Sequence, residues 1–206
     1  MVRKAALVLL LMLLFSATGC AMRSVRTPPL PNNGPDVAKG LLPLGNCDVM
    51  VSRVLTESFQ KLVAGSTVIV DAEMGAMTGT RNLARRGNGA DPNMMIEGVD
   101  FAVKVKKYLK GKGPDTLTIS LPRSDRQAGQ ELGCRYSDYV EPSEGSRWIL
   151  FLDPSTEMSD LWLPAGYPWR YEVKDGQAVP FSLTSPHARE AFPARPVDEL
   201  ISLLKK

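Results

Sequence analysis

Hydrophobic and polar residues alternate along the middle of the chain, a pattern typical of β-strands with one buried face. Residues 99–108, VDFAVKVKKY, place valines and a phenylalanine at every second position and mostly charged residues between them. Residues 115–121, DTLTISL, alternate in the same way after the turn sequence GKGP. The two segments together predict a hairpin with one buried face.

Other segments extend this β pattern. Residues 66–72 (STVIVDA) and 147–152 (RWILFL) are short apolar runs, which indicate buried strands. Residues 171–179 contain an Asp-Gly pair between two short apolar segments and predict a second hairpin. Residues 73–97, rich in glycine, asparagine and methionine, indicate a long loop, and residues 122–146 a polar connection.

Helical spacing occurs at two places. In residues 49–64 apolar residues recur every three or four positions after Asp48, and Gly65 ends the pattern. Residues 197–204 repeat the spacing after a proline. We therefore expect a mainly β (α+β) fold with an amphipathic helix at its start, five or six strands and a short C-terminal helix.

The amino terminus has the order of a secretory signal. Arg3 and Lys4 precede the purely apolar residues 5–15, and small residues follow. The apolar run of 11 residues is short for a hydrocarbon core of about 30 Å, which disfavours a retained membrane helix. An ordinary cleaved signal with an incidental cysteine is the other alternative.

The end of this run, Ala17-Thr18-Gly19-Cys20, resembles the lipobox of bacterial lipoproteins, with alanine in place of the more usual leucine. The resemblance implies that signal peptidase II cuts before Cys20. The thiol of Cys20 then carries a diacylglycerol, and its amine usually takes a further acyl chain such as palmitate. Each buried methylene contributes about 0.8 kcal/mol, so two or more chains hold a protein firmly on a membrane. Membrane lipid is thus the first expected partner, on the extracytoplasmic side: the outer membrane or the outer face of the plasma membrane.

This reading divides the chain into three parts. Residues 1–19 form the signal peptide, residues 20–46 a proline-rich tether, and residues 47–206 one β domain. Removing the signal takes away two positive charges and no acidic one, so the formal charge falls from +3 to +1. Proteins that bind nucleic acids generally have a clear excess of basic residues, so the nearly neutral charge disfavours nucleic-acid binding.

Two cysteines remain after the lipobox, Cys47 and Cys134. Because an exported domain meets an oxidising compartment, we expect a disulfide between them. Two free thiols, or a metal pair completed by the single histidine His187, are the alternatives, although this is a weak zinc set. We expect neither a metal nor a cofactor.

The order of strands resembles the bacterial relatives of the netrin-like (tissue-inhibitor-of-metalloproteinase-like) module. The resemblance rests on STVIVDA, VDFAVKVKKYLKGKGPDTLTI, Gly133-Cys134, EGSRWILFL and WRYEVKDGQAV, and it covers roughly residues 47–181. It implies a small OB-type β-barrel, often in lipoproteins of unknown function. Inhibition of metalloproteinases by the animal proteins needs a free amino-terminal cysteine, so that mechanism is not carried over to this chain.

Candidate binding residues fall in two groups. Lys104, Lys106 and Lys110 lie in a lysine cluster on the expected non-core face of a strand. A solvated face is the favoured reading there, and a phosphate-binding surface or attraction to anionic lipid are alternatives. Residues 161–171, LWLPAGYPWRY, contain Trp162, Tyr167 and Trp169, which we expect to pack over a barrel end unless the rings form an exposed contact surface.

Catalytic chemistry has weak support in the sequence. His187 is the one histidine, and no serine lies in a Gly-x-Ser-x-Gly motif. The acids Asp71, Glu73, Glu97 and Asp100 lie near expected strand ends, where solvation is the simpler reading. We therefore expect a non-enzymatic binding or interaction module of the cell envelope, with a protein or glycan partner. A regulator or inhibitor of a protease, and an enzyme with an unrecognised site, are the alternatives.

Overall fold

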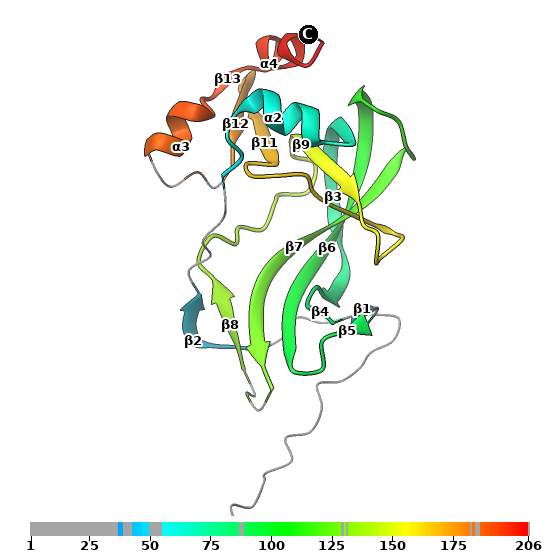
Figure 1. Cartoon of the computed structure of the whole chain (residues 1–206), viewed down its shortest axis with the longest axis vertical. Helices are drawn as coiled ribbons and strands as arrows, with labels where there is room; N and C mark the ends of the chain where they lie inside the picture. The colour runs from blue at the N-terminus through cyan, green and yellow to red at the C-terminus, as the bar shows by residue number, and fades with distance from the viewer. Residues whose placement is uncertain are drawn as a thin grey trace, which may run out of the picture.

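The computed structural model describes residues 37–38, 43–49, 55–86, 89–128, 130, 132–181, 183 and 186–205. These residues form a mainly β fold with one large mixed sheet, one two-stranded sheet and short helices (Figure 1). Within this part of the chain, no helix is long and apolar enough to span a bilayer. The strands are β1 (Val37–Ala38), β2 (Leu44–Val49), β3 (Val68–Asn82), β4 (Arg85–Arg86), β5 (Gly89–Ala90), β6 (Met94–Lys110), β7 (Thr116–Gln127), β8 (Gly133–Tyr136), β9 (Arg147–Pro154), β10 (Leu161–Pro164), β11 (Arg170–Lys174), β12 (Gln177–Pro180) and β13 (Arg195–Pro196). The helices are α2 (Phe59–Gly65), α3 (Pro186–Ala191) and α4 (Val197–Leu203).

Five strands of the large sheet follow one another around a partial ring, in the order β3, β6, β7, β10 and β9, with β9 returning to β3. Their pairings are antiparallel except between β7 and β10, which run parallel. The β7–β10 contact is short, because its register joins Leu161 to Thr118 and Trp162 to Ile119 and goes no further among the described residues. The ring is therefore not a clean barrel.

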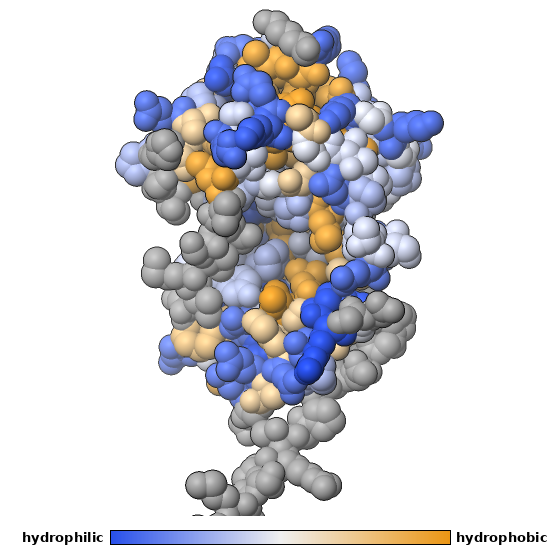
Figure 2. Space-filling model, viewed as in Figure 1, coloured by the Kyte–Doolittle hydropathy of each residue, from blue (hydrophilic) through white to orange (hydrophobic). Residues whose placement is uncertain are grey.

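Five further strands of the large sheet extend the ring at both ends of the molecule. Strands β11, β12 and β13 continue from β9 toward α3 and α4, while β8 and β2 continue from β7 at the opposite end (Figure 1). On the face drawn in Figure 2, hydrophobic residues gather near the helical end and around the middle of the molecule, among hydrophilic ones.

Buried hydrophobic side chains from several strands form the core inside the ring of strands. The predicted core face of β6 and β7 is confirmed for Val99, Phe101, Val103, Leu117 and Ile119, which are all buried. Val105 is only half-buried, and Asp100 on the opposite face of β6 is buried as well. Helix α2 covers one end of the ring and buries Leu62 in the same core.

Helix α2 also supplies an aromatic contact to the core. The ring of Phe59 meets those of Phe151 and Tyr171 edge-on, at 5.8 and 6.4 Å between centroids. These aromatic contacts add to the stability that the buried core gives the barrel-like ring of strands.

Several predictions are confirmed. The hairpin β11–β12 turns at Asp175 and Gly176, both with positive φ (50° and 74°), the conformation that an Asp-Gly turn favours. The C-terminal helix α4 spans Val197–Leu203. A disulfide joins Cys47 and Cys134, whose Cα atoms lie 4.9 Å apart on the paired strands β2 and β8.

The helix predicted for residues 49–64 is confirmed only over its last part, residues 59–64, and is wrong at residue 49 and at residues 55–58. Leu44–Val49 is strand β2, paired with β8, and helix α2 begins only at Phe59, while residues 50–54 lie outside the described part of the chain. The helix starts late because Ser58 caps it: the Ser58 Oγ accepts a hydrogen bond from the Lys61 amide at 3.2 Å.

Two predicted loops are also wrong. In residues 73–97, β3 runs to Asn82 and β6 begins at Met94, with the small hairpin β4–β5 between them. The register of β3 with β6 shifts between Met74 and Met77 and again before Gly79, so the alternation that marks a strand is broken there. In residues 122–146, β7 continues to Gln127 and β8 follows.

The predicted signal peptide and Cys20 lie outside the described residues. Of the predicted tether, Val37–Ala38 pairs with β3, and residues 44–46 belong to β2. The domain boundary at residue 47 stays a prediction.

Candidate functional site

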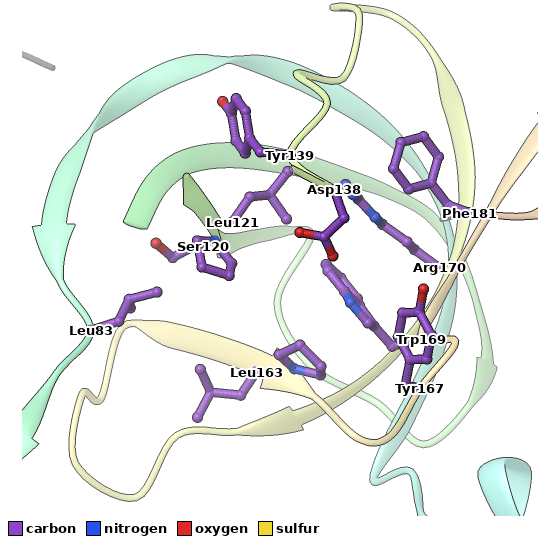
Figure 3. A pocket seen from close by; sticks show the side chains of 12 residues that line it. Leu83, Ser120, Leu121, Asp138, Tyr139, Leu163, Tyr167, Trp169, Arg170 and Phe181 are labelled. Atoms are coloured by element: carbon purple, nitrogen blue, oxygen red, sulfur yellow. The ribbon is translucent and has the colours of Figure 1, made fainter. Parts of the chain in front are cut away.

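A cavity of about 140 Å³ lies where the ring of strands opens. Past Trp162, β10 continues as Leu163 and Pro164 while β7 continues as residues 120–122, and all five of these residues line the cavity. The cavity thus occupies the place where the short parallel pairing of β7 and β10 ends. Figure 3 shows the side chains around it, which come from β7, β10, β11 and the connections next to them.

Arg170, at the start of β11, contributes the cationic group. Its side chain is 8% exposed, and its guanidinium carbon lies 3.9 Å from the ring centroid of Phe181, 5.4 Å from that of Trp169 and 5.5 Å from that of Trp148. Cation–π contacts with desolvated rings contribute up to about 2 kcal/mol. A guanidinium stays protonated in proteins, so this wall carries a permanent positive charge.

Asp138 contributes the negative group. Figure 3 shows its carboxylate and the side chain of Arg170 reaching the same side of the cavity. Asp138 and Tyr139 follow β8, and the disulfide through Cys134 ties β8 to β2. The cross-link therefore holds the segment that brings the carboxylate to the cavity.

Tyr139 closes one wall and is buried. Burial, reinforced by the negative charge of Glu141, raises the pKa of Tyr139 to about 12. The guanidinium of Arg135 lies 5.7 Å from the Tyr139 ring centroid and donates a hydrogen bond to the Tyr139 carbonyl at 3.3 Å. Tyr139 therefore keeps its phenolic proton at neutral pH.

Ser120 lines the cavity from β7 but turns its hydroxyl toward the neighbouring strand. A Cβ on Gly98 of β6 would collide with the Ser120 Oγ and with Leu83, so the missing side chain at Gly98 makes room for both. The Ser120 Oγ is buried and has no hydrogen-bond partner within the described residues. Its orientation makes it a packing group rather than a nucleophile facing the cavity.

Ion pairs hold the connection that carries Leu83. The buried Arg81 pairs with Asp100 of β6 and with Asp160 in the connection between β9 and β10, at 2.7 and 2.9 Å. Arg85 of β4 pairs with Glu157 of that same connection at 3.3 Å. The pairs with Asp160 and Glu157 tie the end of β3 and strand β4, which flank Leu83, to the β9–β10 connection beside the cavity.

The structure separates the two predicted groups of binding residues. Tyr167 and Trp169 line the cavity, with Trp169 only 6% exposed, whereas Trp162 is half-buried against the core. The aromatic segment thus packs and lines a cavity at the same time. The lysines of β6 lie elsewhere and are not among the residues that line it.

Two of the three lysines have structural partners. The Lys110 ammonium donates to the Val63 and Ala64 carbonyls at the end of α2, at 2.7 and 3.1 Å. Lys106 pairs with Glu73 at 2.8 Å, and this contact lowers the pKa of Glu73. Lys104 is exposed on the same strand.

The candidate acidic residues also have cationic partners. Asp71 pairs with Arg147 at 2.6 Å, and the fully buried Glu97 pairs with Arg123 at 2.7 Å. Glu97 also accepts a hydrogen bond from the Ser124 hydroxyl at 2.9 Å. Together with the pairs of Glu73 and Asp100, these contacts give the acids a role in holding strands together.

Sequence reasoning missed Asp138, Arg170 and Phe181 as parts of the site. Arg170 had a signal, because it stands between Trp169 and Tyr171 in the run PWRY, where a charge among rings indicates a cation–π contact. Asp138 had none, because it lies in a polar stretch without periodicity.

Comparisons of this chain with protein-family models, curated proteins and solved structures find no match. Within the described residues, no group of three or more histidine, cysteine or acidic side chains is placed to hold a metal ion.

Proposed function

We propose that this chain is a lipid-anchored, extracytoplasmic and non-catalytic binding module, and that the cavity at the ring opening is its binding site. The domain is an OB-like barrel of the netrin-like kind. The observation that carries the proposal is the cavity itself, in which an aspartate and a caged arginine converge among apolar walls. An apolar pocket with few convergent polar groups is the usual form of a binding site.

The strand order supports the OB-like part of the proposal. A five-stranded, partly open barrel with Greek-key order is the arrangement of OB-type folds. In this chain the three sequential strands β3, β6 and β7 pair as a meander, and β9 and β10 return beside β3 and β7. The short β7–β10 pairing corresponds to the open side of such a barrel.

The amino-terminal sequence supports the anchor. The lipobox-like residues 17–20 end an apolar run of signal length, and a disulfide fits an oxidising compartment. Growth of the producing cells with labelled palmitate tests this part, with Cys20→Ala as the variant. We expect label and membrane association with the natural chain and loss of both with Cys20→Ala; an unlabelled chain that keeps its first 19 residues would refute the anchor.

The chemistry of the cavity supports binding rather than catalysis. Arg170 is permanently protonated and held by three rings, and the Ser120 hydroxyl faces Gly98. Arg170 is therefore suited to orient a ligand rather than to take up a proton, and Ser120 presents no nucleophile to the cavity.

A cavity-filling variant tests the binding function. Leu163→Trp places a large ring in the cavity, and Val179→Ala on the exposed part of β12 is the control. Detergent-solubilised full-length protein is cross-linked in envelope extracts, and the captured proteins and glycans are compared. We expect captured material to fall at least fivefold with Leu163→Trp only. Equal capture by both variants would place the binding surface elsewhere, and a captured protease or a turned-over compound would favour the alternative functions.

A further inference from the structure

We propose that the cavity at the ring opening binds one neutral sugar ring of an envelope glycan. This inference rests on the proposed function and names the ligand class of the same site.

The charges of the cavity wall favour a neutral ligand. Asp138 and Arg170 are the two charged residues in the lining, and their charges cancel. A ligand with a net charge would bring an uncompensated charge into a partly buried site, which is unfavourable. A hydroxyl group can instead donate to the Asp138 carboxylate and accept from the Arg170 guanidinium, because a hydroxyl has both functions.

The other walls favour a ligand that also has an apolar face. Leu83, Leu163 and Pro164 form aliphatic surface, and Tyr167 is a half-buried ring beside them. A pyranose combines hydroxyl groups at its rim with C–H groups on its faces, so one ring matches both kinds of wall.

The size of the cavity limits the enclosed part of a ligand to a small group such as one sugar ring. Its volume of about 140 Å³ lies below the roughly 300–1,000 Å³ of sites that enclose drug-sized ligands. The exposed Pro164 and the partly exposed Tyr167 and Phe181 border the cavity, so further sugar residues of a chain extend into solvent.

Nucleobases fit this site less well. Base recognition by stacking needs accessible aromatic faces and cations for the phosphates. Trp169 is almost fully buried, Phe181 is stacked by Arg170 at 3.9 Å, and the lysines of β6 are not in the lining.

Isothermal titration of the purified, detergent-solubilised full chain tests the proposal. The neutral probes are tetramers of glucose and of N-acetylglucosamine. A glucosamine tetramer supplies a cationic arm, a galacturonate tetramer an anionic arm, and an eight-nucleotide thymidine strand a nucleic-acid arm. We expect one neutral tetramer to bind at least tenfold more tightly than the charged probes.

Variants connect this binding to the cavity. Asp138→Asn, which keeps size and removes charge, should weaken the neutral tetramer at least tenfold, and Leu163→Trp should abolish its binding. Glu144→Gln, an exposed carboxylate in the same connection as Asp138, should change nothing. Thermal melting of each variant checks folding, and the two independent cavity variants keep the test decisive if one of them does not fold.

Tighter binding of a charged probe or of the thymidine strand would overturn the proposal. An affinity for the neutral tetramer that neither Asp138→Asn nor Leu163→Trp changes would also overturn it. If no sugar binds while Leu163→Trp still reduces capture from envelope extracts, the sugar assignment fails and the binding function stands. If capture is also insensitive to Leu163→Trp, both fail.

Discussion

Arg81 and Asp100 form a two-pronged ion pair that is almost completely removed from water. The Arg81 Nε donates to the two carboxylate oxygens of Asp100 at 2.9 and 2.8 Å, and the two side chains are 4% and 2% exposed. The remaining guanidinium nitrogens donate to Asp160 at 3.1 and 2.9 Å. Burial alone would lower the pKa of Arg81, but hydrogen bonds and charges of the two aspartates outweigh it and raise the pKa.

Removing one partner of this pair should be strongly destabilising. Arg81→Ala leaves Asp100 buried without its cation, and such changes cost about 3–5 kcal/mol. Urea denaturation followed by circular dichroism measures the free energy of unfolding. Arg86→Ala, at an exposed position five residues further along, is the control and should change it by less than about 0.5 kcal/mol.

A double replacement separates the pair from its individual charges. Arg81→Met with Asp100→Leu removes both buried charges, so it should recover most of the loss caused by Arg81→Ala. If Arg81→Ala costs no more than Arg86→Ala, the ion pair does not stabilise the fold.

The Arg81–Asp100 pair also shows where sequence reasoning stops. The alternation in residues 99–108 assigned Asp100 correctly to the face opposite the core valines, and that face was expected to meet solvent. The partner lies 19 positions earlier, beyond two register shifts of β3, in a segment that resembled a loop. Local periodicity predicts which face a residue takes, but it contains no information on what a distant segment places over that face.

Lys110 should stabilise helix α2 from the neighbouring strand. Its ammonium group donates to two carbonyls at the helix end, where unsatisfied C=O groups and the helix dipole attract a cation. Lys110→Ala should therefore lower the free energy of unfolding by about 1 kcal/mol. Lys107→Ala, exposed on the same strand, is the matched control. Equal effects of the two substitutions would show that the helix-end contact is not formed in solution.

The disulfide should contribute a large part of the stability. Its cysteines are 87 residues apart, and closing a loop of that length in the unfolded chain is worth about 4–5 kcal/mol on the chain-entropy model. We expect the Cys47→Ser, Cys134→Ser double variant to unfold at markedly lower urea concentration than the oxidised protein. Reduction of the natural protein should give the same shift, and a shift below about 1 kcal/mol would contradict the prediction.

The candidate site was predictable only in part, for reasons visible in its residues. Tyr167 and Trp169 were identified because aromatic density is a property of the local sequence. Their partners Asp138 and Phe181 come from other connections, and only the ring of strands brings them together. Lys104, Lys106 and Lys110 formed an equally dense local cluster, yet two of them bind structural partners. Density of one residue type therefore marks a candidate, and the tertiary partners decide its role.

Tyr139 should make the protein sensitive to alkali. Its pKa is raised to about 12, first by burial and then by the charges of Glu141 and Glu97, against the opposing effects of Arg123 and Arg135. In the unfolded chain a tyrosine ionises near pH 10, so above that pH the unfolded state loses its proton first. The stability contributed by the neutral phenol is complete below pH 10 and is lost as the pH rises to about 12.

Tyr139→Phe removes this ionisation while keeping the ring in the cavity wall. Urea denaturation at half-unit steps from pH 9 to pH 12 should show a shallower loss of unfolding free energy for Tyr139→Phe than for the natural protein. Tyrosinate absorbance at 295 nm, recorded on the folded proteins, should show one late-titrating group fewer in the variant. Parallel pH profiles of the two proteins would mean that Tyr139 is exposed to solvent. The conclusion that Tyr139 forms a buried wall of the cavity would then be wrong.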